Sequence, residues 1–179
     1  SRLARWLPTG FIRASVGLHL LGAVALVLVP HRWPLIVGAI ATNHALIALI
    51  GMWPRRRLLG PNLRRLPDRY AARGEIALTF DDGPDPRSTG PLLDLLQQHH
   101  IPATFFCTGV NLKKYPELAR RIHADGHLLA NHSYRHKWTH NFLFGKSLYH
   151  EMRNTQEITE QITGQPCRYY RPPMGLTNP

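Results

Sequence analysis

The stretch 76-IALTFDDGPDP-86 decides the fold of this chain, because an apolar run ends there at two adjacent carboxylates and a Gly-Pro turn. The apolar run, 76–80, predicts a buried β-strand. Successive strand residues point to opposite sides, so Asp81 and Asp82 can take different roles. Strand ends are where α/β proteins place their functional groups. An exposed turn is the competing interpretation of Asp-Asp-Gly-Pro taken alone.

Two histidines form the second group of candidate residues. His132 and His136 follow another apolar run, 127–130, and their spacing of four predicts one shared face of a helical turn. That arrangement suits two ligands of one metal ion. With one carboxylate, the set would leave coordination positions open for water and substrate, as catalytic sites do. The chain has 11 histidines, so a chance pair of bystanders is the alternative.

An arginine at a third strand end completes the group. Residues 167–171 predict a strand that stops at Pro172-Pro173, and Arg171 stands at its end. A guanidinium there could hold a carboxylate ionised through a bidentate contact. The alternative is an ordinary solvated arginine.

These three motifs, in this order, resemble those of the polysaccharide deacetylases, the NodB-type domains of carbohydrate esterase family four. The first motif of that family, Thr-Phe-Asp-Asp-Gly-Pro, stands at 79–84. The second, His-Ser/Thr-x-x-His, stands at 132–136, and the third, Arg-x-Pro-x-Gly, at 171–175. The run 103–109 is similar to the second strand of the family. The resemblance covers about residues 74 to 179.

The resemblance implies a role for each matched residue. Asp81 would be the catalytic base and Arg171 the residue that orients it. The implied ligands of a divalent metal, expected to be zinc with cobalt, nickel or manganese as alternatives, are Asp82, His132 and His136. Ser133 would steady the histidine loop, and a backbone N–H near Met174 and Gly175 would help to hold an oxyanion. The family often has an aromatic residue where this chain has Met174.

The implied function is hydrolysis of an amide bond. A metal-dependent member would remove an N-acyl group, acetyl above all, from an amino sugar in a polysaccharide, peptidoglycan or lipid-linked glycan. The family's later motifs, including a histidine that acts as general acid, would lie beyond the residues present. We therefore expect the N-terminal half of a deacetylase domain. The alternative is a membrane-anchored remnant that binds metal without turnover.

Charge and hydropathy predict a membrane region before this domain. The net charge is +11, and the arginines of the N-terminal third flank apolar stretches, which argues for a lipid surface and against nucleic acid. Residues 14–29 and 35–53 carry no full charge and approach the ~20 residues that cross a bilayer. Trp6, Trp33 and Trp53 stand at the edges of these runs. A helical hairpin in a bacterial-type inner membrane is predicted, with core helices of a soluble protein as the alternative. A cleaved signal peptide is disfavoured, because there are two runs and no clear small-residue cleavage site. His19 and His44 are assigned to helix–helix packing.

The arginine distribution also predicts sidedness. Arg2, Arg5 and Arg13 precede the runs and Arg55, Arg56 and Arg57 follow them, whereas only Arg32 lies between. The positive-inside rule keeps both flanks in the cytoplasm. If only one run spans, the following domain lies outside, where most relatives act. We expect residues 1–57 to form the hairpin, 58–74 a basic linker, and 75–179 the deacetylase part.

The remaining pattern alternates between strand and helix. Strands are predicted at 76–80, 103–107, 127–130 and 167–171, and helices at about 89–99, 115–124 and 147–163. Alternation of this kind predicts an α/β fold with parallel strands. The resemblance implies a partial (β/α) barrel of the NodB type. Cys107 and Cys167 are expected as separate thiols without a disulfide.

Overall fold

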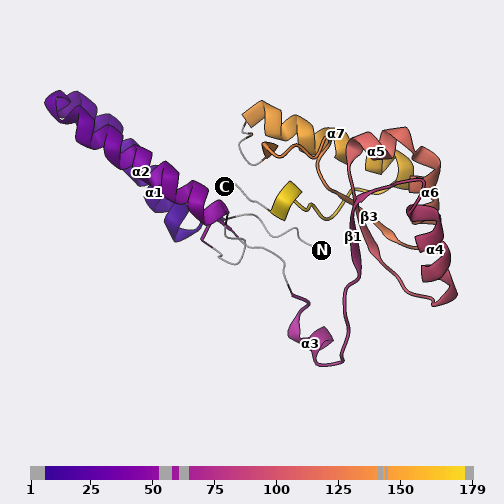
Figure 1. Cartoon of the computed structure of the whole chain (residues 1–179). Coiled ribbons are helices and arrows are strands. Elements are labelled where there is room, and N and C mark those ends of the chain that lie inside the picture. The colour runs from indigo at the N-terminus through magenta and orange to yellow at the C-terminus, as the bar shows by residue number, and fades with distance from the viewer. Residues whose placement is uncertain (1–6, 53–57, 61–64, 141–142, 144, 176–179) are drawn as a thin grey trace. The chain divides into compact units, whose positions relative to one another are not determined.

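In the computed structural model of the chain, residues 7–52, 58–60, 65–140, 143 and 145–175 are described (Figure 1). They belong to two compact units, an N-terminal helical unit and an α/β unit from Arg65 to Gly175.

The helical unit is a hairpin of two apolar helices. Helix α1 spans Gly10–Leu28 and helix α2 spans Trp33–Gly51, and a 3-10 turn, η1 (Pro30–Arg32), joins them. Thr9 caps α1 by accepting a hydrogen bond from the Ile12 N–H. Both helices are long and apolar enough to cross a membrane by length and composition, and few of their residues are buried. That exposure disfavours the alternative in which the two helices are the core of a soluble protein.

Polar side chains meet between the two helices. The Asn43 amide donates to the Ser15 hydroxyl at 2.7 Å, and the His19 ring bonds the Ser15 carbonyl at 2.7 Å. The His19 and His44 ring centroids are 5.0 Å apart. These contacts agree with the assignment of both histidines to helix–helix packing. The flanking residues Trp6, Trp53 and the arginines at 2, 5 and 55–57 lie outside the described residues.

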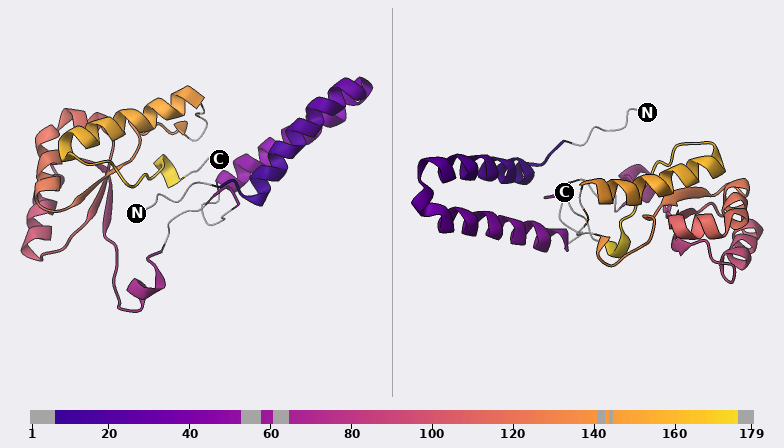
Figure 2. Two further views of the ribbon diagram at one scale, coloured as in Figure 1. Left: turned by 180° about the vertical axis from the view of Figure 1, so that it is seen from behind. Right: turned by 90° about the horizontal axis from the view of Figure 1, so that it is seen from above.

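The α/β unit contains a three-stranded parallel sheet. Strands β1 (Thr79–Gly83), β2 (Thr104–Cys107) and β3 (Leu128–Asn131) lie side by side in that order. The connecting helices, which Figures 1 and 2 show gathered on one side of the sheet, are α4 (Thr89–Gln98), α5 (Gly109–Lys114), α6 (Pro116–Ala124) and α7 (Gly145–Thr163). A short helix, α3 (Asp68–Ala71), precedes the sheet, and a 3-10 turn, η3 (Pro173–Gly175), follows α7. The predicted α/β class with parallel strands is confirmed.

The core lies between the sheet and these helices. Nine side chains from the sheet and the helices form one buried cluster, namely Leu93, Leu96, Ala103, Phe105, Cys107, Leu112, Ala119, Ile122 and Leu129. Helices α4 and α6 present one apolar stripe each to the sheet, as amphipathic helices do. Because all three strands run in one direction, their carboxyl ends share one edge of the sheet.

Two of the predicted strands differ from the structure. The first begins at Thr79 rather than Ile76, which is 86% exposed, and continues through Asp82 to Gly83. The fourth, 167–171, is reduced to one parallel bridge between Asn131 and Tyr170. Pro172 and Pro173 follow at once and have no N–H to extend a ladder, which explains the short pairing.

The helices and the two thiols of this unit agree with the predictions more closely than those two strands do. The three predicted helices of this unit are present within about two residues of their expected ends, whereas α5 was missed. Cys107 is buried and Cys167 is half-buried, and both are free thiols, as expected. Burial raises the pKa of the Cys107 thiol far above its usual value, so this group stays protonated.

The hairpin generates a prediction about membrane sidedness. A cytoplasmic reporter enzyme fused after Arg69 should be active and a phosphatase fused there should be inactive, because both arginine-rich flanks should stay in the cytoplasm. Inserted beside Arg32, between the two helices, the phosphatase should be active and the cytoplasmic reporter inactive. Phosphatase activity after Arg69 without a cytoplasmic signal would instead place the α/β unit outside.

A second prediction concerns the close approach of α5 to the loop after β3. A Cβ added at Gly109 would lie 2.2 Å from the Tyr134 ring and 2.6 Å from the Thr155 hydroxyl. Gly109→Ala should therefore lower the free energy of unfolding of the α/β unit by about 1–3 kcal/mol, the usual cost of overpacking. Urea unfolding followed by circular dichroism measures this change.

Gly90→Ala is the matched control, because a Cβ at that helical position would meet nothing within 4 Å. It should leave the α/β unit as stable as before or stabilise it by up to about 1 kcal/mol. Equal stability of the two alanine variants would show that the Gly109 contact does not matter.

Candidate active site at the carboxyl ends of the strands

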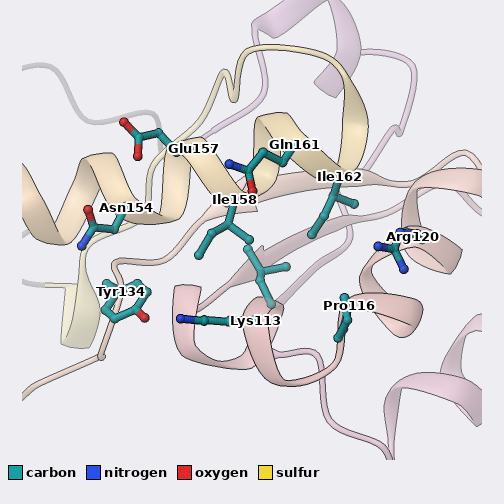
Figure 3. A pocket seen from close by; sticks show the side chains of 10 residues that line it. Lys113, Pro116, Arg120, Tyr134, Asn154, Glu157, Ile158, Gln161 and Ile162 are labelled. Atoms are coloured by element: carbon teal, nitrogen blue, oxygen red, sulfur yellow. The ribbon is translucent and has the colours of Figure 1, made fainter.

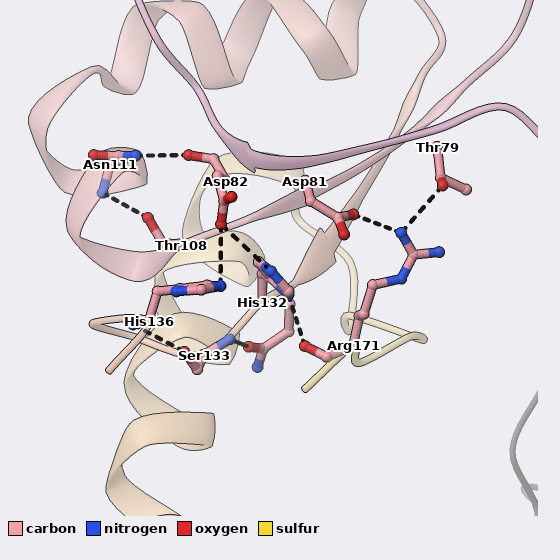
Figure 4. A network of polar contacts seen from close by, with 10 residues as sticks. Thr79, Asp81, Asp82, Thr108, Asn111, His132, Ser133, His136 and Arg171 are labelled. Carbon is pink, nitrogen blue, oxygen red and sulfur yellow. Dashed lines mark hydrogen bonds and ion pairs between the residues drawn. The ribbon is translucent and has the colours of Figure 1, made fainter. Parts of the chain in front are cut away.

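Side chains from three separate motifs meet at the carboxyl edge of the sheet (Figure 4). Asp81 and Asp82 come from β1, and His132 and His136 come from the loop after β3. Arg171 reaches the same edge from the segment that bridges Asn131. The five residues predicted to be catalytic or to bind metal are therefore gathered in one place.

A bulge in β1 separates the two carboxylates. Asp81 pairs with Phe106 and Gly83 with Cys107, so Asp82 is an extra residue between them. Its φ of 67° lies in the left-handed region, which non-glycine residues rarely adopt. The Asn111 amide donates to the Asp82 carbonyl at 2.8 Å and supports this conformation. As a result, the Asp82 side chain turns toward the histidines while that of Asp81 turns toward Arg171 (Figure 4).

The histidines lie in a loop rather than on a helical turn, so that part of the prediction was wrong. Ser133 and His136 have φ values of 66° and 50°, which no α-helix contains. The Ser133 hydroxyl accepts a hydrogen bond from the His136 N–H at 3.1 Å. The irregular loop still brings the two rings together, with their centroids 4.9 Å apart.

The histidine nitrogens and the Asp82 carboxylate form a set of converging metal donors. The Nε2 atoms of His132 and His136 lie 3.4 and 3.3 Å from the same Asp82 oxygen. The Nδ1 atom of His132 lies 2.8 Å from the Arg171 carbonyl, which fixes the proton on Nδ1 and leaves the Nε2 lone pair free. Burial lowers the pKa of His132, which favours the neutral imidazole that binds metals.

The spacing of these donors fits a small divalent cation. Ligands of a tetrahedral zinc ion, with bonds of about 2.0–2.1 Å, are about 3.3 Å apart. The two nitrogen–oxygen distances match that value and exceed those of good hydrogen bonds. Among the described residues, no other group of three histidine, cysteine or carboxylate side chains converges in this way. The donor set therefore suits zinc or a similar ion.

Asp81 and Arg171 form a separate ion pair. The Arg171 Nη1 atom donates to Asp81 at 2.5 Å and to the Thr79 hydroxyl at 3.1 Å. The guanidinium also lies over the Phe106 ring, 4.0 Å from its centroid. The hydrogen bond to the carboxylate comes from one nitrogen, so the expected bidentate contact is not formed. Arg171 is instead held by three partners, two of which, Thr79 and Phe106, sequence reasoning did not single out.

The residues after Arg171 form a strained turn at the rim of the site. Met174 has a φ of 60° and a side chain that is 66% exposed. The Gly175 N–H donates to the Pro172 carbonyl, so it is already used. Left-handed non-glycine residues are often found at functional sites, and Met174 is such a residue. Its role in holding an oxyanion stays a prediction.

Six other histidines of the α/β unit lie outside the metal cluster: His99, His100, His123, His127, His140 and His150. Two of them are buried for other reasons. His127 accepts a hydrogen bond from the Ala103 N–H at 3.3 Å, and His140 is bonded to the Tyr170 hydroxyl. Burial lowers the pKa of both rings, so they remain neutral structural groups.

A surface groove lies elsewhere on the unit, between α5, α6 and α7 (Figure 3). Lys113, Arg120, Glu157 and Ile158 contribute to its walls. It contains neither carboxylate of β1 and neither of the two converging histidines, and Tyr134 is the one residue of the histidine loop that lines it.

Comparison with known proteins gives matches to the α/β unit. A family model described as polysaccharide deacetylase matches residues 68–179. A peptidoglycan-N-acetylglucosamine deacetylase of Bacillus cereus is 41% identical over 107 residues, which are 58% of this chain and 37% of that protein. A chitooligosaccharide deacetylase of Rhizobium leguminosarum bv. trifolii is 56% identical over 61 residues, which are 34% of this chain and 28% of that protein.

Solved structures agree with these sequence matches. The peptidoglycan deacetylase PdaC from Bacillus subtilis has a TM-score of 0.54 and 39% identity, covering 57% of this chain and 50% of that structure. The chain thus spans about a quarter to a half of the length of the relatives that it matches.

The two carboxylates of β1 should respond differently to substitution. Asp82→Asn should weaken zinc binding at least about ten-fold, because it replaces the converging carboxylate by a neutral amide. Asp81→Asn should leave zinc binding unchanged, because Asp81 contacts Arg171 instead. Competition with a chromogenic chelator measures both affinities. Equal loss of zinc in the two variants would show that their roles are divided wrongly.

Proposed function

This chain belongs to the polysaccharide deacetylase family, and on that premise we propose that it takes part in metal-dependent removal of an N-acyl group, most commonly acetyl, from an amino sugar. One observation carries the proposal: a cluster of metal donors and a carboxylate–arginine pair lie side by side at one sheet edge (Figure 4). The donor cluster can hold an electrophilic cation, and the arginine of the pair can keep the carboxylate ionised so that it can act as a base.

The metal site assigned here consists of Asp82, His132 and His136. Zinc is the proposed ion, with cobalt, nickel and manganese as alternatives, since two imidazoles and one carboxylate suit all of them. Such a cation supplies Lewis acidity, which makes water a stronger acid and polarises the amide carbonyl.

Asp81 is the proposed general base. It accepts the proton of the attacking water as the new bond to the carbonyl carbon forms. The positive charge of Arg171 favours the ionised carboxylate, and Thr79 and Phe106 keep the guanidinium in place. The departing amine needs a proton, and the family resemblance assigns that step to a histidine of a later motif. A backbone N–H near Met174, other than that of Gly175, is proposed to help stabilise the oxyanion.

A glycan substrate is supported by the relatives that the α/β unit resembles. Two of the relatives are named for N-acetylglucosamine of peptidoglycan and for chitooligosaccharides. The apolar hairpin supports a substrate close to a membrane, which includes wall glycans and lipid-linked sugars.

Acetate release from N-acetylglucosamine oligomers tests this proposal. The assay uses the 179-residue chain in detergent and any longer product of the same gene, each before and after a chelator and after added zinc. We expect chelation to abolish release and zinc to restore it. In the active protein, Asp81→Asn should lower kcat by about 10²–10⁴-fold, the usual contribution of a general base.

Zinc binding without acetate release from either protein would favour the competing proposal, a membrane-anchored metal-binding protein without turnover. Acetate release that is unaffected by chelation, or equal in the Asp81→Asn variant, would contradict the proposed chemistry.

A further inference from the structure

Side-chain oxygens accept the hydrogen bonds of the N–H groups in the loop that carries the two metal-site histidines. Four successive N–H groups, from Ser133 to His136, all donate to side-chain oxygens. The Asn131 amide oxygen accepts the first at 2.9 Å, and the Ser133 hydroxyl accepts the last at 3.1 Å. Because no ladder or helical bond involves these four N–H groups, their hydrogen bonding depends on those side-chain acceptors.

The two middle N–H groups share one acceptor from a distant part of the chain. Those of Tyr134 and Arg135 donate to the same oxygen of Glu151, at 3.2 and 2.9 Å. Glu151 lies on α7, and its side chain is only 14% exposed. Adjacent N–H groups that converge in this way form a cradle for an anion, and here the carboxylate fills it.

The opposite side of the loop is held by α5. The carbonyls of Ser133 and Tyr134 accept hydrogen bonds from the N–H groups of Gly109 and Val110, at 3.0 Å each. Helix α7 adds one more contact, because the Asn131 amide donates to the Met152 carbonyl at 2.8 Å. The segment between the histidines is therefore clamped between α5 and α7, and Glu151 is the charged member of the clamp.

We propose that Glu151 is a positioning residue for the metal centre, holding the His132 and His136 imidazoles at the spacing that the ion requires. The inference rests on the proposed metal site. Glu151 donates no atom to the ion. It acts through the backbone between the two histidines, and its loss would leave two adjacent N–H groups without their acceptor.

Zinc affinity of the detergent-solubilised 179-residue chain tests this inference without any need for turnover. Glu151→Ala should weaken zinc binding about 10–100-fold, as expected when a group that orients metal ligands is lost. Glu151→Gln keeps an oxygen at the same distance along the side chain, so it should recover most of the affinity. With Co²⁺ as the probe, the visible absorption of the Ala variant should change in shape, which a loss of folded protein alone would not cause.

Glu157→Gln is the matched control. Glu157 lies on the same helix and loses the same charge, but it pairs with Arg153 at the surface. Its zinc affinity and Co²⁺ spectrum should equal those of the unsubstituted chain. If circular dichroism shows that Glu151→Ala does not fold, the Glu151→Gln variant decides. A folded Glu151→Gln variant whose zinc affinity is as weak as that of a ligand variant, such as His136→Ala, would contradict the inference.

Two outcomes separate this inference from the function on which it rests. If the unsubstituted chain binds no zinc, the proposed metal site itself is wrong. If it binds zinc and folded Glu151→Ala binds equally well with an unchanged Co²⁺ spectrum, only the role of Glu151 is overturned.

Discussion

The left-handed conformation of Asp82 is the constraint on which the site depends. One extra residue in β1 turns two neighbouring carboxylates in different directions, one toward the histidines and the other toward Arg171. In an unbulged strand the two side chains would simply alternate between opposite faces of the sheet. The bulge thus allows a single strand end to supply both a metal donor and a base. Non-glycine residues adopt this conformation at a cost, so the surrounding contacts must hold it in place.

Those contacts come from elements far apart in the sequence. Asn111 of α5 bonds the Asp82 carbonyl, and the N-terminus of the same helix holds the loop after β3. That loop has no regular structure of its own and relies on oxygens of Asn131, Ser133 and Glu151. The parallel sheet provides the frame, because its strands deliver all of these segments to one edge. Buried side chains from α4, α6 and β2 keep the frame rigid.

The sequence alone predicted which residues meet at the site better than it predicted their local shape. The motifs around Asp81, His132 and Arg171 placed the right residue types at strand ends, and parallel strands then bring those ends together. The spacing of the histidines, in contrast, suits a helical turn as well as a loop, and only the side-chain acceptors of the loop N–H groups decide between them. Glu151 carries no local signal, since its partners lie 16 and 17 residues away. The sequence before Pro172 predicts a strand. How far that segment pairs depends on the neighbouring strand, which the pattern of apolar residues in the segment itself does not show.

The most direct test of this account is the zinc-edge X-ray absorption spectrum of the 179-residue chain loaded with one equivalent of zinc. The structure predicts one bound ion with two imidazole ligands and metal–ligand distances of about 2.0–2.1 Å. His136→Ala should remove one imidazole from that spectrum, whereas His140→Ala should leave both, because His140 bonds Tyr170 instead. A zinc ion without imidazole ligands, or an unchanged spectrum in His136→Ala, would contradict the account.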